Sequence, residues 1–170
     1  LHRFVHQYAS EGGREMIIVT PDGLTDFYMG AYENYFFKEL MPEVESKFKV
    51  KKGREYRTVA GLSMGGRQSA ALSRKYPSMF GYVGMFSGVV PPEVDEATGK
   101  DMTLDAVFAA KPKLYWIACG KTDGVMENSL LLKEYCEAQG HPVSFYESEG
   151  GHIWRNWREY LTIFAQKIFK

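Results

Sequence analysis

Cysteine is scarce in this sequence, and neither sign of charge is in excess. Only two cysteines, Cys119 and Cys136, occur among 170 residues, too few for a disulfide framework or a cysteine-rich metal cluster. We interpret both as buried thiols, with a bond between them as the alternative. Lysine plus arginine and aspartate plus glutamate both number 21, so the net charge is zero. Proteins that bind the phosphate backbone of nucleic acids carry a basic excess, so no nucleic acid partner is expected.

Long apolar stretches are also absent. No run approaches the roughly 20 residues that span a bilayer, and residues 1–6 lack the charged region and apolar core of a signal peptide. We therefore expect no membrane partner. The chain is 45% hydrophobic and 15% aromatic, enough to bury one sizeable core, which predicts a single domain over residues 1–170.

Extended and helical patterns alternate along the chain. Extended segments are expected at 16–20, 58–60, 83–87, 114–119 and 143–147, and helices at 4–9, 32–48, 67–75, 127–138 and 154–169. This alternation predicts an α/β fold, a mostly parallel sheet with helices on both faces. Pro42 falls inside the second helix and predicts a kink or break there. The segment 88–102, rich in proline and acidic residues, predicts a mobile loop that rims the strand ends.

The most informative motif is Gly61-Leu62-Ser63-Met64-Gly65, where the strand expected at 58–60 runs into the next helix. A Gly-x-Ser-x-Gly sequence at a strand-to-helix junction is typical of a nucleophile elbow, which exposes a strained serine at the end of its strand. The pattern alone is weak, because about 0.1 match is expected by chance in this composition. Ser63 is the candidate nucleophile.

Residues able to activate Ser63 follow later in the chain. Asp123 comes just after the strand expected at 114–119, and His152 follows the last strand behind two glycines. A serine hydroxyl needs a base to take its proton, and a histidine base needs a carboxylate to orient it. Since the loops after parallel strands meet at one edge of a sheet, we expect Ser63, Asp123 and His152 to converge.

Alternatives remain for the acid and the base. Asp123 precedes a glycine and is also explained as an ordinary turn residue. The competing acids are Glu127, Asp105 and Asp95, and the competing histidines are His2, His6 and His141.

The rest of the site is less well defined. The backbone N–H of Met64 is expected to donate to an oxyanion, with a second donor upstream of the recognisable motifs. Tyr28 and Trp154 are candidate substrate-binding walls, although an aromatic residue is as often part of a core. Trp157 lies on an apolar stripe of the last helix, so we interpret it as structural.

Six segments of the chain resemble the esterase D-like α/β-hydrolases: 34–42, 60–66, 76–81, 86–88, 119–123 and 150–157. The tail is most similar to carbohydrate esterase family 1 (CE1), the feruloyl and acetylxylan esterases. The resemblance implies ester hydrolysis through an acyl-enzyme on Ser63, with His152 as base and then acid, and Asp123 as its orienter. It also implies a feruloylated or acetylated polysaccharide such as xylan as substrate, and no metal or organic cofactor.

The sequence departs from this family at its start. Family members begin with several more strands and a His-Gly-type loop, so we expect the chain to lack these N-terminal strands. The sheet edge left open favours a homo-oligomer. The resemblance further implies a secreted or periplasmic protein. Open alternatives are a formylglutathione or siderophore-ester hydrolase, an acyltransferase of the same fold, or a non-catalytic fragment that binds carbohydrate or a partner chain.

Overall fold

The computed structural model describes residues 16–21 and 30–170 of the chain. Residues 53–170 belong to one compact unit, and the described residues between Arg14 and Lys52 belong to another. The helix expected at 4–9 lies outside the described residues. In the described ranges, no helix combines the length and the apolar character needed to cross a membrane.

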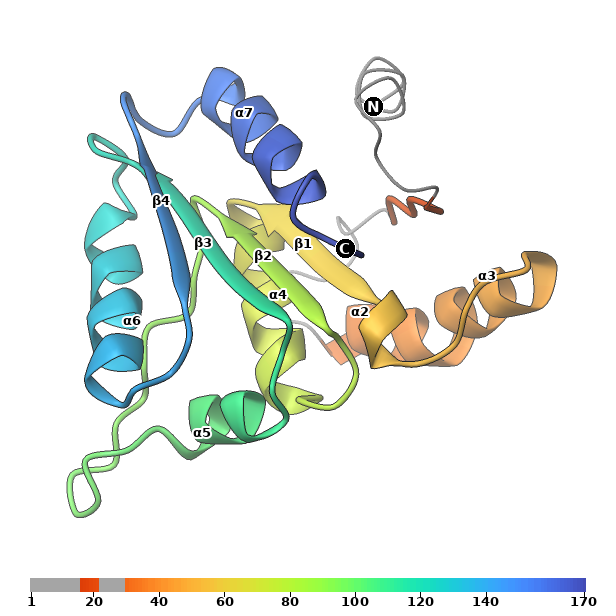
Figure 1. Ribbon diagram of the computed structural model, residues 1–170, viewed down its shortest axis with the longest axis horizontal. Coiled ribbons are helices and arrows are strands. Elements are labelled where there is room, and N and C mark those ends of the chain that lie inside the picture. Colours follow the sequence, from red (N-terminus) through yellow and green to blue (C-terminus); the bar gives the residue numbers. More distant parts are fainter. Residues whose placement is uncertain (1–15, 22–29) are drawn as a thin grey trace. The chain divides into compact units, whose positions relative to one another are not determined.

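The larger unit is built on a four-stranded sheet in which every pairing is parallel (Figure 1). Its strands follow one another in sequence order: β1 Thr58–Leu62, β2 Tyr82–Phe86, β3 Leu114–Gly120 and β4 Ser144–Ser148. The two central strands are the most buried, as their continuous apolar runs predict. Four of the five expected strands are thus confirmed.

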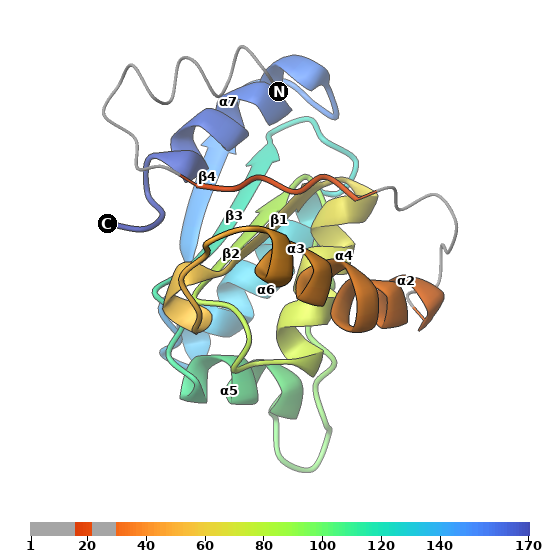
Figure 2. The ribbon, with the colours of Figure 1, turned by 90° about the vertical axis from the view of Figure 1, so that its right-hand side faces the viewer.

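Helices cover both faces of this sheet, as predicted. They are α4 Met64–Lys75, α5 Met102–Ala109, α6 Met126–Ala138 and α7 Trp154–Ala165, with a short 3₁₀ turn, η2, at Arg54–Tyr56. Figure 2 shows α7 on one face and α4 and α6 on the other. The last helix ends four residues earlier than expected. α5 was not predicted, although Asp101 caps it by accepting hydrogen bonds from the N–H groups of Thr103 and Leu104.

An aromatic cluster joins α7 to the sheet. The ring of Phe86 packs edge-on against Trp116 and Phe164, with centroids 5.5 Å and 5.6 Å apart. The other face of the sheet buries the free thiol of Cys119, and α6 buries that of Cys136, which confirms both as buried thiols. Burial raises the pKa of both thiols, that of Cys136 to about 12.

The segment 88–102 differs from the expected rim loop. It begins at the end of β2, but its turn at 95–100 lies beside α5, away from the C-terminal ends of the strands (Figure 1). A buried ion pair between Arg74 of α4 and Asp101 fastens it, with an Nη1–Oδ2 distance of 3.3 Å. Arg74 also donates to the carbonyls of Val90 and Pro91. Proline and acidic content alone did not reveal this buried anchor.

The described residues of the smaller unit form three helical pieces in succession: α2 Gly30–Tyr35, the π-helical η1 Phe36–Leu40 and α3 Met41–Lys47. Pro42 stands in the first turn of α3, where its missing N–H is tolerated. The Met41 N–H reaches back five residues to the carbonyl of Phe36, so the break predicted at Pro42 takes the form of a wide π turn.

The strand expected at 16–20 is not formed. Ile17, Ile18 and Val19 are exposed, and the backbone there has no regular structure. A strand needs a neighbour for its backbone hydrogen bonds. Among its described residues the smaller unit offers no strand to pair with, so the apolar run alone gave a wrong prediction.

Candidate active site

Ser63 occupies the sharp turn between β1 and α4. Its backbone has φ 51° and ψ −116°, a conformation that residues other than glycine rarely adopt. The Ser63 N–H donates to the carbonyl of Phe86 at the end of β2, over 2.8 Å. Backbone strain of this kind is typical of functional sites, where the surrounding structure maintains it. It is also the geometry that the elbow motif predicts.

Glycines give this turn its space. A Cβ atom on Gly61 would collide with the backbone of Gly65, and one on Gly88 would collide with the carbonyl of Ser63. A Cβ atom on Gly66 would lie 2.5 Å from the carbonyl oxygen of Gly88. The Cβ position of Gly65, by contrast, has nothing within 4 Å. Packing therefore requires Gly61, Gly66 and Gly88, but not the second glycine of the motif.

Ser63, His152 and Asp123 form one hydrogen-bonded chain. His152 follows β4, and its Nε2 lies 2.9 Å from Ser63 Oγ. Its Nδ1 lies 3.0 Å and 3.1 Å from the two carboxylate oxygens of Asp123, which follows β3. The structure thus brings together three residues that the sequence places after three different strands.

The surroundings of Asp123 and His152 differ. The Asp123 side chain is fully buried, whereas that of His152 is 38% exposed. Asp123 also accepts a hydrogen bond from the N–H of Val125, over 3.1 Å. With its proton on Nδ1, His152 donates to Asp123 and presents Nε2 as an acceptor for the Ser63 hydroxyl. This arrangement suits general-base activation of the serine.

The competing acids lie elsewhere. Asp105 lies in α5 and pairs with His141, with an Oδ1–Nε2 distance of 2.9 Å. Asp95 accepts hydrogen bonds from Thr98 within its own turn. Glu127 is exposed in the first turn of α6. The histidines at positions 2 and 6 lie outside the described residues.

A comparison with family models decides the classification. Residues 2–167, nearly the whole chain, match the model of the Esterase family. The chain belongs to the Esterase family.

Two curated relatives are esterases by name. The endo-1,4-beta-xylanase/feruloyl esterase of Xylanibacter ruminicola is 30% identical over 172 residues, which cover 92% of this chain and 22% of that protein. The acetyl esterase of Caldicellulosiruptor saccharolyticus is 24% identical over 85% of this chain and 68% of its own length. The chain therefore spans only 22% of the xylanase/feruloyl esterase.

Solved structures show the same fold. A CE1 ferulic acid esterase from Anaeromyces mucronatus superimposes with a TM-score of 0.77 at 25% identity, over 96% of this chain and 68% of that one. The S-formylglutathione hydrolase of Staphylococcus aureus superimposes with a TM-score of 0.75 at 21% identity, over 97% of this chain and 76% of that one. These likenesses confirm the predicted α/β-hydrolase fold of this chain.

Of the remaining predicted site residues, Met64 and Trp154 are described, and Tyr28 lies outside the described residues. Met64 is the first residue of α4, where a backbone N–H has no acceptor within its own helix. It directly follows Ser63, so this donor stands next to the serine hydroxyl. Trp154 is 65% exposed at the start of α7 and packs edge-on against Trp157, at 5.2 Å between centroids. This indole is therefore not part of the core.

Sequence reasoning missed two neighbours of His152. Trp157 was interpreted as a core residue, and it is buried, but its ring also stands perpendicular to the His152 imidazole with centroids 4.8 Å apart. Asn156 is buried beside it and bonds to the loop that carries His152. The sequence carried one signal for Asn156, namely that it is a polar residue next to the apolar stripe of α7.

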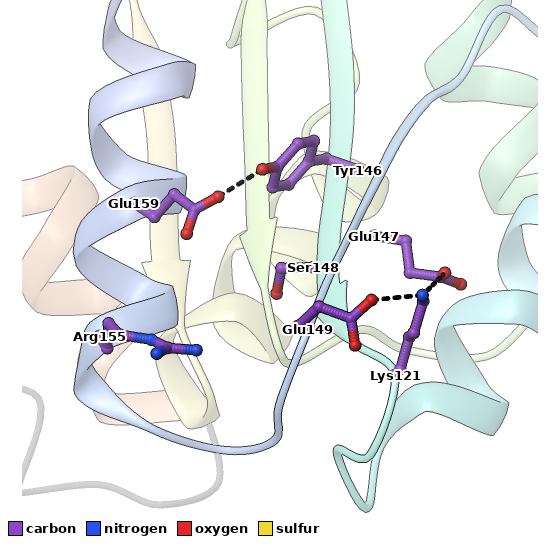
Figure 3. A pocket seen from close by; sticks show the side chains of 7 residues that line it. All are labelled: Lys121, Tyr146, Glu147, Ser148, Glu149, Arg155 and Glu159. Atoms are coloured by element: carbon purple, nitrogen blue, oxygen red, sulfur yellow. Dashed lines mark hydrogen bonds and ion pairs between the residues drawn. The ribbon is translucent and has the colours of Figure 1, made fainter.

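An open pocket of about 360 Å³ lies beside the ends of β3 and β4 and the start of α7 (Figure 3). Seven residues line it: Lys121, Tyr146, Glu147, Ser148, Glu149, Arg155 and Glu159. Lys121 Nζ lies 2.5 Å from Glu149 and 3.8 Å from Glu147, and the hydrogen bond to Glu149 raises the pKa of Lys121. These ion pairs link the loop before Asp123 to β4, through Glu147, and to the loop before His152, through Glu149.

The described part of the chain gathers no cluster of three or more histidine, cysteine, aspartate or glutamate side chains that would hold a metal ion.

Proposed function

We propose that this member of the Esterase family is a serine carboxylic-ester hydrolase with Ser63, His152 and Asp123 as its catalytic triad. The observation that carries this proposal is the hydrogen-bonded chain from Ser63 Oγ through His152 to the buried Asp123. The strained elbow supports it by presenting Ser63 at the end of β1, with the Met64 N–H beside it.

The proposed reaction runs through an acyl-enzyme. His152 Nε2 takes the Ser63 proton while Oγ bonds to the ester carbonyl carbon, and the oxyanion formed accepts from the Met64 N–H. The imidazolium then protonates the alkoxide as the ester C–O bond breaks, releasing the alcohol and leaving acyl-Ser63. Water, activated by the same imidazole, hydrolyses this ester and returns the proton to Ser63. Asp123 keeps the imidazole oriented and stabilises its positive charge throughout.

For the substrate, we propose feruloyl or acetyl esters of plant cell wall polysaccharide such as xylan. The support is the 30% identity to a protein named xylanase/feruloyl esterase and the fold shared with a CE1 ferulic acid esterase. The exposed Trp154 offers a flat apolar surface near His152 on which a feruloyl ring or a sugar could stack. Such a substrate lies outside the cell, so the proposal includes export of the protein.

The test is hydrolysis of methyl ferulate, 4-nitrophenyl acetate and S-formylglutathione by the chain and its Ser63→Ala variant. Ser144→Ala, at the exposed start of β4, is the matched control. We expect turnover that needs Ser63, spares the control and favours ferulate. Preference for the thioester would move the substrate to another esterase of this fold, and absence of Ser63-dependent turnover from folded protein would contradict the proposed activity.

A further inference from the structure

Asn156 sits in the first turn of α7 with its side chain buried inside the loop that carries His152. The residue is 1% exposed. Its Nδ2 donates to the carbonyl of Glu149 over 2.9 Å and to that of Gly151 over 3.1 Å. One amide group therefore bonds to the backbone on both sides of Gly150, immediately before His152.

The two acceptors fix the orientation of this amide. Turned by 180°, the Asn156 side chain would point its oxygen at two carbonyl oxygens, which repel it. Gly150 lies at the bend of this loop with φ +83°, a conformation that residues other than glycine rarely adopt. The Asn156 amide closes this turn together with two backbone donors, the Ile153 N–H bonded to Gly151 and the Thr122 N–H bonded to Gly150.

The same amide touches the strand that leads to Asp123. A Cβ atom on Gly120, the last residue of β3, would lie 3.0 Å from Asn156 Nδ2. The Lys121 N–H donates to Ser148 and the Thr122 N–H donates to Gly150, over 2.9 Å and 3.0 Å. Asn156 thus stands where the chain before Asp123 meets the chain before His152.

We propose that Asn156 is a positioning residue, whose amide holds the His152 loop in register with Asp123 and Ser63. This inference rests on the proposed function, and Asn156 itself touches none of the reacting groups. Displacing a base by about 1 Å can cost on the order of 10²-fold in rate, because proton transfer needs aligned groups. Loss of the amide should therefore lower kcat and leave substrate binding largely intact.

The test compares Asn156→Ala and Asn156→Asp with Asn128→Ala, an exposed asparagine in α6, as control. Asn156→Asp keeps the shape of the side chain but places carboxylate oxygens against two carbonyls. We expect kcat for 4-nitrophenyl acetate to fall about 10²-fold in both variants, with KM within about twofold. The control should match the wild-type protein.

A second readout needs no substrate. The proton shared by His152 Nδ1 and Asp123 is expected to give a low-field proton NMR resonance in the wild-type protein, which both Asn156 variants should lose or shift. If Asn156→Ala does not fold, Asn156→Ser, which keeps one donor, takes its place and should show an intermediate loss.

Two outcomes separate this inference from the proposed function. Folded Asn156 variants with unchanged kcat and an unchanged resonance would overturn the positioning role, even if their melting temperature falls. A wild-type protein that shows the resonance but no Ser63-dependent turnover would overturn the proposed function instead, while a resonance lost in the variants would still support the positioning role.

Discussion

The imidazole of His152 stands perpendicular to the buried indole of Trp157, with ring centroids 4.8 Å apart. Trp157→Ala should lower the free energy of unfolding by about 3–5 kcal/mol, because it empties a large core position. Trp157→Phe should cost much less, since a ring stays against His152 and the indole N–H has no hydrogen-bond partner among the described residues. Urea unfolding measures the free energy of unfolding of both variants. Trp154→Ala, at an exposed position, is the control and should stay within about 0.5 kcal/mol; equal losses at the two tryptophans would contradict this packing.

Substitutions of the glycines around the elbow should show which of them the turn geometry requires. Gly88→Ala pushes a methyl group into the Ser63 carbonyl and Gly61→Ala pushes one into the Gly65 backbone, so both should reduce stability and ester turnover severely. Gly65→Ala meets open space within the first turn of α4 and should leave stability equal or raise it by about 0.5–1 kcal/mol. Thermal unfolding of the three variants measures these differences in stability. A Gly65→Ala variant as unstable as Gly88→Ala would show that this local geometry is wrong.

Two aspartate–histidine pairs among the described residues of the larger unit allow an internal comparison. Asp123→Asn should lower kcat on the order of 10⁴-fold, since an amide cannot hold His152 in the required tautomer. Asp105→Asn alters a similar pair with His141, far from Ser63, and should leave kcat unchanged. Steady-state kinetics on 4-nitrophenyl acetate compares them. A small effect of Asp123→Asn would return Glu127 to consideration as the orienting acid.

Much of this architecture was predictable from local pattern. The apolar runs of β2 and β3 and the elbow at Ser63 each carry their signal within a few residues, and all are found. The apolar run at 16–20 has the same appearance, but whether it becomes a strand depends on a pairing partner that local pattern does not contain.

The missed features share this dependence on distant contacts. Asp101 caps α5 locally, but its ion pair with Arg74 joins residues 27 apart in the chain. The contact between Trp157 and His152 exists only once α7 has docked on the sheet. The convergence of Ser63, Asp123 and His152 could be predicted, because parallel strands bring their C-terminal ends to one edge of the sheet. The residues that support the site from other elements could not be predicted in this way.

Asp101 makes stability dependent on acid pH. Burial disfavours its charged form, but hydrogen bonds from Thr103, Glu93 and Leu104 and the charge of Arg74 outweigh burial and lower the pKa of its carboxyl. Because the folded pKa lies below the unfolded value of about 3.9, this stabilisation is complete above that value and is lost as pH falls through the folded pKa.

Asp101→Asn should therefore lower the free energy of unfolding at pH 7 by about 3–5 kcal/mol, since it leaves the buried Arg74 unpaired. The difference from the wild-type protein should shrink as the pH falls below about 3.9, the unfolded value, toward the lower folded pKa. Urea unfolding from pH 2.5 to 7 measures it. A constant difference over this range would show that the charge of Asp101 is not responsible.

The nucleophilic role of Ser63 can be measured without choosing a substrate. A fluorophosphonate reacts with activated serines, and intact-mass analysis followed by peptide mapping locates the adduct. We predict one adduct per chain, on Ser63, formed slowly or not at all in His152→Ala and absent in Ser63→Ala. Labelling of another residue, or equal labelling of the wild-type protein and Ser63→Ala, would contradict the assignment of Ser63 as the nucleophile.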